Sequence, residues 1–334
     1  AASAADMSTS VDGSITSTPA AQDPAFSDAA WQKVKLPHDW SIDGPYDAKW
    51  SGSEAFLPAG IAWYRKHFSM PALSGGQRVS LRFGAIYKYS TIFLNGKQVG
   101  ARPYGYSTFE CDLTDTLKPG DNTLAVRVDH SQFADARWYP GSGIIRAVSL
   151  VRTAPIHVAP DGVFVTTPAV DAAAAKVNVQ ATIKNDSAAA SMYQTTVHLY
   201  DPAGRQVAQT TSAPVEVAAG GENTLQQEAS VPKPQLWSVD DPALYTALVE
   251  VRMGSGNGTI VDTYVASFGI RTAKFDPNTG FWLNGQNLKL KGVCLHEDAG
   301  SLGAAIPRQV WERRLRILKD AGVNAIRTSH NPPD

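Results

Sequence analysis

Polar side chains follow two apolar, strand-like segments near the end of the sequence. His296 comes directly after the segment at residues 288–295, and Arg327, His330 and Asn331 follow the segment at 323–326. Imidazole, guanidinium and amide groups all donate hydrogen bonds, so together they could form a site. The alternative is that they are ordinary loop residues that cap two strands. Two histidines and one arginine at a single edge favour a site.

The stretch between these two segments has the period of an α-helix. Trp311, Leu315 and Leu318 recur at helical spacing, and charged residues occupy the opposite face. Pro307 suits the first helical position and Gly322 suits the end of the helix. Strand, helix and strand predict a β-α-β unit whose strands are parallel and adjacent or nearly so. Their carboxyl ends then share one edge, which in a (β/α)8 barrel is where chemistry takes place.

The same segments resemble known signatures. Residues 324–333, Asn-Ala-Ile-Arg-Thr-Ser-His-Asn-Pro-Pro, are similar to the first signature of glycoside hydrolase family 2, and residues 291–298 resemble the end of its first barrel strand. That family includes β-galactosidases, β-glucuronidases and β-mannosidases. The Ser-His-Asn-Pro-Pro form resembles the β-galactosidase branch most. The resemblance implies that residues 273–334 are the first β-α-β part of a TIM barrel, which the chain leaves incomplete.

The overall composition excludes some classes of function. The 334 residues carry 30 Lys and Arg against 31 Asp and Glu, so the net charge of -1 gives no electrostatic basis for binding nucleic acid or an anionic membrane. No apolar run is long enough to span a bilayer. Cys111 and Cys294 lie in strand-like segments of different domains, which favours two free thiols over a disulfide.

The first 22 residues are rich in Ala, Ser and Thr, which predicts a disordered lead-in. No basic segment followed by an apolar core is present, so no intact signal peptide is visible. The small residues at the start resemble what remains after export processing. This weakly favours a periplasmic or secreted location.

Two regions of short strands precede the β-α-β unit. Residues 23–152 show many short strands with turns between them, including an Asn95-Gly96 hairpin, which predicts a jelly-roll sandwich. Three of its segments, at residues 36–40, 60–66 and 137–146, resemble the sugar-binding domain of the same family. Residues 153–272 have the length and strand spacing of an immunoglobulin-like sandwich, to which we assign a spacer role. The fold class is therefore multidomain: jelly roll, immunoglobulin-like sandwich, and the start of a TIM barrel.

Aromatic residues are dense in the jelly-roll region. Sugar rings present apolar C–H faces that stack on aromatic rings, although most of these side chains are expected to fill the core. Trp138 and Tyr139 stand beside Pro140 in a loop, where burial is harder, and the resemblance implies that this loop reaches the sugar pocket. Arg137 lies near the same register, where some relatives have an acidic residue. Tyr87 occupies a similar loop and is a weaker candidate for sugar binding.

The resemblance also implies which chemistry the chain lacks. Retaining glycosidases use two carboxyl groups about 5–5.5 Å apart, one as nucleophile and one as acid/base. In family 2 both are glutamates on later barrel strands, so we expect them after Asp334 and expect no catalytic residue in this chain. Glu297 and Asp298 cannot flank a glycosidic bond from both faces, since both follow a single strand. Asp39 and Asp135 are further carboxylates with even less support.

What remains is a supporting set of side chains. The resemblance implies that His296 and His330 donate hydrogen bonds to sugar hydroxyls, most strongly in the transition state. Arg327 would hold the nucleophile ionised and oriented, or form a structural ion pair inside the barrel. Asn331 is either a polar contact to the sugar or a turn residue before Pro332. No cofactor and no metal ligand are predicted in this chain, and the metal requirement of the whole enzyme stays open.

Two classes of function remain. The first is the N-terminal portion of an exo-acting β-glycosidase. We expect a β-galactosidase, with a β-glucuronidase as the alternative, and we expect the full-length enzyme to be a homo-oligomer. Its partner is a β-galactoside or a related oligosaccharide. The second is a non-catalytic carbohydrate-binding protein of two sandwiches. The β-α-β unit favours the enzyme, because a binding module has no use for a crossover that ends in Arg327 and His330.

Overall fold

The computed structural model describes residues 7–12, 19–132, 136–254, 256 and 258–333. The chain divides into two compact units. The first comprises Ala1–Ser74, Arg78–Arg152 and Lys291–Asp334, and the second comprises Gly75–Gln77 and Thr153–Leu290.

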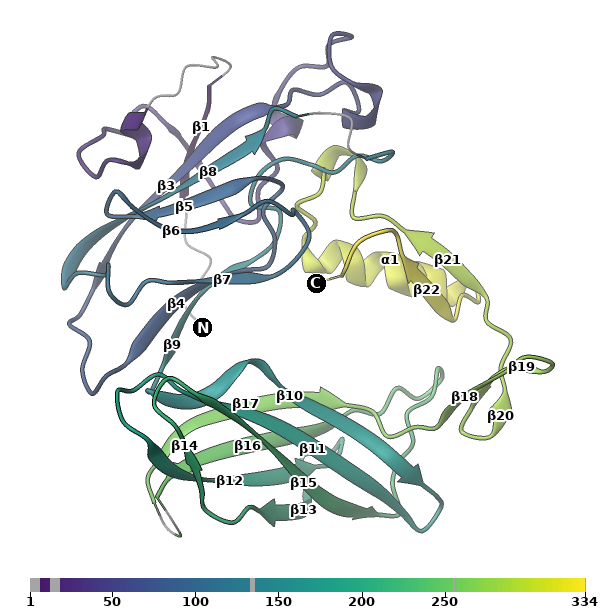
Figure 1. The fold of residues 1–334 in the computed structure, drawn as a ribbon. Coiled ribbons are helices and arrows are strands. Elements are labelled where there is room, and N and C mark those ends of the chain that lie inside the picture. The colour runs from purple at the N-terminus through teal and green to yellow at the C-terminus, as the bar shows by residue number, and fades with distance from the viewer. Residues whose placement is uncertain (1–6, 13–18, 133–135, 255, 257, 334) are drawn as a thin grey trace. The chain divides into compact units, whose positions relative to one another are not determined.

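The first unit contains a sandwich of two antiparallel sheets (Figure 1). Its larger sheet has the strand order β2-β1-β3-β8-β5-β6, and its smaller sheet has the order β7-β4-β9. The strands are β1 (Met7–Asp12), β2 (Gln32–Val34), β3 (Gly60–Met70), β4 (Arg78–Phe83), β5 (Ser90–Leu94), β6 (Lys97–Arg102), β7 (Phe109–Asp112), β8 (Gly120–His130) and β9 (Val148–Thr153).

The core of this sandwich lies between its two sheets. Strand β4 alternates buried and half-buried positions, so that Val79, Leu81 and Phe83 all face inward. They pack with Ile92 and Val126 of the larger sheet. The turn between β5 and β6 is the predicted hairpin, with positive φ angles of 52° at Asn95 and 84° at Gly96. Local sequence patterns therefore predicted this sandwich.

One part of the first unit differs from the prediction. The sequence predicts a disordered lead-in over residues 1–22, but Met7–Asp12 forms strand β1 between β2 and β3. The reason is that a strand pairs through its backbone, so low apolar content does not prevent it from joining a ladder. A short 3-10 helix, Pro19–Gln22, follows. Residues 1–6 and 13–18 lie outside the described part of the chain.

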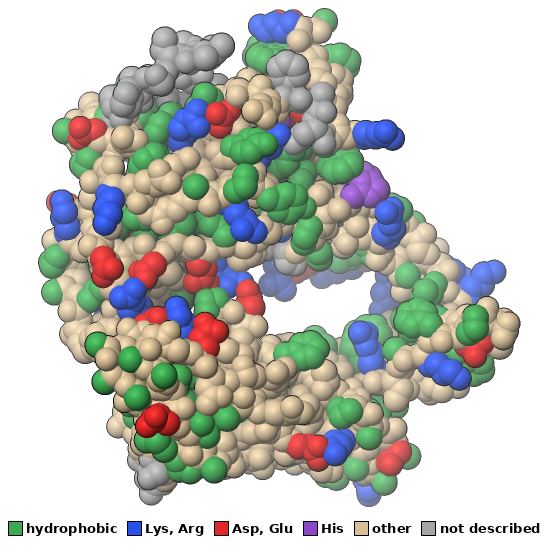
Figure 2. Space-filling view, viewed as in Figure 1, with side chains coloured by type: hydrophobic (Ala, Val, Ile, Leu, Met, Phe, Trp, Pro, Cys, Tyr) green, Lys and Arg blue, Asp and Glu red, His purple; other side chains and the backbone are tan. Residues whose placement is uncertain are grey.

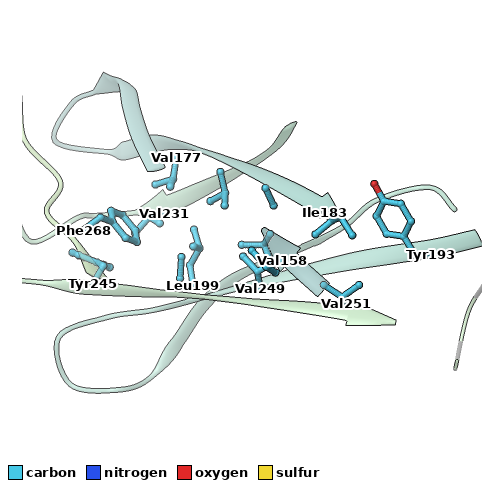
Figure 3. Packing of buried hydrophobic residues seen from close by; sticks show 14 of the residues in the cluster. Val158, Val177, Ile183, Tyr193, Leu199, Val231, Tyr245, Val249, Val251 and Phe268 are labelled. Atoms are coloured by element: carbon cyan, nitrogen blue, oxygen red, sulfur yellow. The ribbon is translucent and has the colours of Figure 1, made fainter. Parts of the chain in front are cut away.

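The second unit is also a sandwich. One sheet has the order β10-β11-β15, and the other has the order β13-β12-β16-β17 with β14 paired to β12. The strands are β10 (Ile156–Val170), β11 (Ala174–Asn185), β12 (Ser191–Tyr200), β13 (Gln206–Thr211), β14 (Val215–Val217), β15 (Glu222–Pro232), β16 (Tyr245–Met253) and β17 (Ile260–Phe268). Figure 3 shows its core, where Val177, Leu199 and Val249 lie between the sheets. A small three-stranded antiparallel sheet follows, with β18 (Ala273–Asp276), β19 (Gly280–Leu283) and β20 (Gln286–Asn287).

The end of the chain belongs to the first unit and forms the predicted β-α-β unit. Strand β21 (Gly292–Leu295) pairs in parallel with β22 (Ala325–Thr328), and helix α1 (Arg308–Asp320) connects them (Figure 1). The helix begins one residue later than predicted, with Pro307 as its N-cap, and Gly322 follows its end at a φ of 86°. The first strand is shorter than predicted, because the structure has no strand at residues 288–291.

The surface carries charges of both signs. Figure 2 shows Lys and Arg side chains interspersed with Asp and Glu side chains, and the two signs are nearly equal in number in the sequence. None of the helices in the described part of the chain is long and apolar enough to cross a membrane.

Candidate functional site

The two strand ends bring His296 and His330 together. In the parallel register Leu295 lies opposite Thr328, so the residues that follow both strands emerge at the same edge. The imidazole centroids are 5.1 Å apart, and the rings meet edge to face at 84°. The sequence predicts this convergence, and the structure has it.

A tryptophan from the sandwich joins the two histidines. Trp138 lies in the loop between β8 and β9, with its ring centroid 4.9 Å from that of His330 and 5.8 Å from that of His296. Its Nε1–H donates to the hydroxyl of Tyr106 at 3.3 Å. The three rings form a cluster, called the Trp138 cluster below, to which two separate parts of the sequence contribute.

The hydrogen bonds of the two histidines differ. His330 is exposed, and its Nδ1 lies 3.3 Å from Nη2 of Arg327. A guanidinium only donates, so Nδ1 of His330 accepts and the ring proton sits on Nε2, where it can be donated to a ligand. By contrast, Nδ1 of His296 is shielded from solvent and has no hydrogen-bond partner in the described part of the chain. A ligand hydroxyl could supply the hydrogen bond that this shielded nitrogen lacks.

Arg327 extends from β22 beside β21. Its Nη1 lies 3.6 Å from Sγ of Cys294, the residue opposite it in the ladder. The guanidinium lowers the pKa of the Cys294 thiol through this hydrogen bond. Within the described residues its hydrogen-bond partners are Cys294 and His330. The nucleophile glutamate is expected after Asp334, so its contact to Arg327 stays a prediction.

Glu297 is bound to the sandwich. Arg146, which is buried, donates from Nε to Oε1 of Glu297 at 2.7 Å and from Nη2 to Oε2 at 2.6 Å. The same guanidinium donates to the backbone carbonyls of Tyr106 and Pro332. A bidentate guanidinium stabilises the ionised carboxylate and occupies both of its oxygens, so Glu297 holds the site together and is poorly suited to acid or nucleophilic chemistry.

Asp39 forms a second junction between the sandwich and the β-α-β unit. Its carboxylate is 1% exposed and accepts hydrogen bonds from the backbone N–H of Ser142 at 2.9 Å and of Ala304 at 2.9 Å. Burial raises the pKa of Asp39 even though these donors act in the opposite direction. A Cβ at Gly303 would come 2.2 Å from Oδ2 of Asp39, so only glycine allows this approach.

The weaker candidates for sugar binding and catalysis lie in different environments. The hydroxyl of Tyr139 donates to Asp39 at 2.8 Å, and burial raises the pKa of Tyr139, so this side chain supports the loop. Tyr87 is 3% exposed and packs against Tyr106, so it lies beneath the site as a packing residue. Arg137 is exposed next to Trp138. Asp135 lies outside the described residues.

Sequence reasoning missed Tyr104, Tyr106 and Arg146 at this edge. The Tyr104 hydroxyl donates to Oδ1 of the predicted residue Asn331 at 3.4 Å, and Tyr106 and Arg146 hold the loops in place. Tyr104 and Tyr106 were visible only as members of an aromatic-rich region, and Arg146 only as the end of a family-like segment. No local pattern identifies their partners. In the described part of the chain, no group of three or more His, Cys, Asp or Glu could hold a metal ion.

Along the chain, two β-sandwiches are followed by one β-α-β unit with parallel strands. Models of the glycosyl hydrolases family 2 match along the chain: the sugar-binding domain at residues 29–155, the family 2 domain at 156–271 and the TIM barrel domain at 277–334. The chain therefore belongs to glycosyl hydrolases family 2.

Individual relatives cover nearly all of this chain. A β-galactosidase from Bacteroides ovatus is 43% identical over 94% of this chain and 37% of that protein. A putative β-glucuronidase from Formosa agariphila is 37% identical over 92% of this chain and 29% of that protein. The crystal structure of a family 2 member from Bacteroides cellulosilyticus superposes with a TM-score of 0.91 and 35% identity, over 98% of this chain and 42% of that chain. The chain thus spans about a third of the length of the curated relatives it matches.

Proposed function

We propose that this chain is the N-terminal portion of a retaining exo-β-glycosidase that hydrolyses terminal, non-reducing β-D-galactosyl residues. The Trp138 cluster carries the proposal, because it combines an apolar ring face with two imidazoles at the carboxyl ends of parallel barrel strands. The similarity to a β-galactosidase at 43% identity supports galactose as the sugar.

In the proposed reaction this chain binds the sugar and orients both the sugar and the nucleophile. Trp138 stacks on the C–H face of the sugar, and His330 donates from Nε2 to a sugar hydroxyl. Hydrogen bonds that strengthen as charge develops on the sugar ring lower the barrier. Arg327 keeps the nucleophile glutamate ionised and oriented. That glutamate and the acid/base glutamate are expected after Asp334, and they would perform the double displacement.

The exposed apolar residues of the β-α-β unit support a longer barrel. Leu315 and Ile317 of α1 are 45% and 51% exposed, and Ile326 of β22 is 39% exposed. Residues Trp311, Leu315 and Ile326 line an apolar groove of about 320 Å³. Exposed apolar residues on the helix and on one strand of a two-stranded parallel sheet fit a sheet that continues, since parallel sheets are buried on both faces.

The test compares two proteins on 4-nitrophenyl β-galactoside. Residues 1–334 alone are expected to show no hydrolysis, whereas the longer protein that contains them hydrolyses the galactoside. In the longer protein, His330→Ala is expected to lower kcat/KM about 10- to 100-fold, since it removes a hydrogen bond that is strongest in the transition state. His67→Ala, which changes a histidine with a 55% exposed side chain on β3, is the control. Hydrolysis by a homogeneous sample of residues 1–334, or an unchanged His330→Ala enzyme, contradicts the proposal.

A β-glucuronidase is the second candidate. Relatives of that name match most of this chain, and the structure of a Bacteroides uniformis β-glucuronidase superposes with a TM-score of 0.86 at 30% identity, over 98% of this chain and 39% of that chain. A uronic acid needs a cation near its carboxylate, and Arg137 is an exposed cation beside Trp138. Arg137→Gln would then raise KM for 4-nitrophenyl β-glucuronide and leave KM for the galactoside unchanged. Faster hydrolysis of the galactoside by the wild-type protein favours the first candidate.

We further propose that the full-length protein is a homo-oligomer. Light scattering coupled to size-exclusion chromatography measures its mass directly, and a monomeric mass contradicts this part of the proposal.

A further inference from the structure

Tyr104 contacts Asn331 at the edge of the site. It lies in the connection between β6 and β7, and its hydroxyl donates to Oδ1 of Asn331 at 3.4 Å. Tyr104 is exposed, at 45%, as are Tyr46 and Tyr89 of the same unit, whereas Tyr64, Tyr87 and Tyr106 are at most 4% exposed. What distinguishes Tyr104 is that an exposed ring is combined with a hydroxyl contact to a residue that follows β22.

Buried contacts hold this connection in place. The Tyr106 hydroxyl accepts from Nε1 of Trp138, and the Tyr106 carbonyl accepts from Nη1 of Arg146 at 3.1 Å. Gly105 lies close against the ring of Tyr87, where a Cβ would come within 2.2 Å of a ring atom. Because its neighbours are fixed, Tyr104 is presented at the edge of the site on a rigid support, which lowers the entropic cost of binding.

The amide of Asn331 is oriented by this contact. Its Oδ1 accepts from Tyr104, so its Nδ2 group points elsewhere with two N–H donors, and Nδ2 has no hydrogen bond in the described part of the chain. An open amide donor beside an exposed aromatic ring is the combination that recognises a sugar, which offers hydroxyl acceptors at its rim and an apolar C–H face.

We propose that Tyr104 is a further substrate-binding residue of this site. Its ring stacks on a pyranose ring of the β-galactoside, and its hydroxyl holds Asn331 so that Nδ2 donates to a hydroxyl of the same substrate. The inference rests on the proposed function and deepens it, since it adds a second aromatic wall that a loop of the sandwich contributes. The ligand is a neutral hexopyranoside, because the pair offers no charge.

The experiment uses the full-length protein and 4-nitrophenyl β-galactoside. Tyr104→Ala is expected to raise KM about 3- to 10-fold, the range of a lost aromatic stacking contact, with a smaller effect on kcat. Tyr104→Phe keeps the ring and releases Asn331, so it raises KM about 2- to 3-fold. Tyr46→Ala, which truncates a tyrosine that is 75% exposed, is the control and leaves KM unchanged. A KM for Tyr104→Ala equal to that of the control overturns the inference.

A second measurement separates this inference from the proposed function. If the wild-type protein hydrolyses neither the galactoside nor the glucuronide, the proposed function fails, and the variants are compared by saturation-transfer NMR with methyl β-galactoside. Weaker transfer to the sugar in Tyr104→Ala than in Tyr46→Ala supports the inference. Equal transfer in both, or none in the wild-type protein, overturns it. Matched thermal midpoints establish that each variant is folded.

Discussion

The two sandwiches of this chain are built alike but bury different kinds of side chain. Among the described residues, the sandwich of the second unit has a core of alternating apolar residues, and His157 is its one buried ionisable side chain outside the tyrosines. The sandwich of the first unit buries charged or ionisable groups of both signs, namely Asp39, Glu54, Arg65, Lys88, His130 and Arg146. Both are sandwiches of two sheets, so the two-layer arrangement alone does not account for the difference.

The difference shows what the first sandwich does beyond folding. Burying a charge costs free energy unless it is paired and hydrogen-bonded, so such groups persist where their bonds are needed. Arg146 and Asp39 direct their hydrogen bonds to Glu297 and Ala304 of the β-α-β unit. Arg65 instead bonds to Asp28 and to the backbone of the segment that precedes it. Two of the buried charges therefore position the candidate site, and a third fixes an irregular segment to the sheet.

The largest expected effect is the loss of the Arg146–Glu297 pair. Arg146→Met leaves the Glu297 carboxylate without its bidentate partner, which is expected to reduce the free energy of unfolding by about 3–5 kcal/mol. The double variant with Glu297→Gln should recover part of that loss, because it removes the unpaired charge. Urea denaturation followed by tryptophan fluorescence measures both changes.

The matched control lies in the second unit. Lys176 and Glu228 form an ion pair at 2.7 Å, but their side chains are 49% and 56% exposed. Lys176→Met should change the free energy of unfolding by less than about 1 kcal/mol, because solvent screens exposed pairs. Equal losses for Arg146→Met and Lys176→Met would remove the contrast between the two sandwiches.

The second sandwich should respond most to lost apolar volume. Leu199 is fully buried between its sheets, and Leu199→Ala is expected to cost about 3 kcal/mol through lost burial and the cavity left behind. Leu199→Met keeps the volume and should cost less than about 1.5 kcal/mol. A loss for the methionine variant as large as that for alanine would mean that shape, and not volume, controls this core.

Local rules explain which features could be predicted from the sequence. Gly322 at the end of α1, the Asn95-Gly96 hairpin and the parallel strands of the β-α-β unit all follow from patterns within a few residues or from one crossover connection. The meeting of His296 and His330 follows from the same connection. Each prediction needed only the chemistry of one short segment.

Long-range partners could not be predicted, because no local pattern encodes them. Arg146 and Glu297 are distant in the sequence, and an arginine at a strand end has the same local pattern whether it pairs with solvent or with a carboxylate. The Tyr104–Asn331 contact was missed for the same reason. Strand β1 was missed because composition reports what a segment buries and not what its backbone pairs with.

The smallest expected effect is on how stability depends on pH, where one carboxyl group in each unit should act with opposite sign. Burial raises the pKa of Asp39 above its ordinary value of 3.8, so the folded protein binds this proton more tightly than the unfolded chain, and its contribution to stability falls as pH rises from that value. In the second unit, hydrogen bonds from the backbone and side chain of Arg205 lower the pKa of Asp201. Its contribution is therefore present above the ordinary value and is lost as pH falls.

Two asparagine variants isolate these contributions. As pH rises between about 3 and 7, the thermal midpoint of the wild-type protein should fall relative to that of Asp39→Asn and rise relative to that of Asp201→Asn. The comparison uses differences at each pH, so that all other carboxylates cancel. Asp39→Asn also replaces an acceptor with an amide donor that faces the N–H of Ala304, which lowers its midpoint by a constant amount and leaves the slope intact. Slopes of the same sign would mean that the hydrogen bonds to Asp39 outweigh its burial, and the first sandwich would then hold a fully ionised carboxylate at its junction with the site.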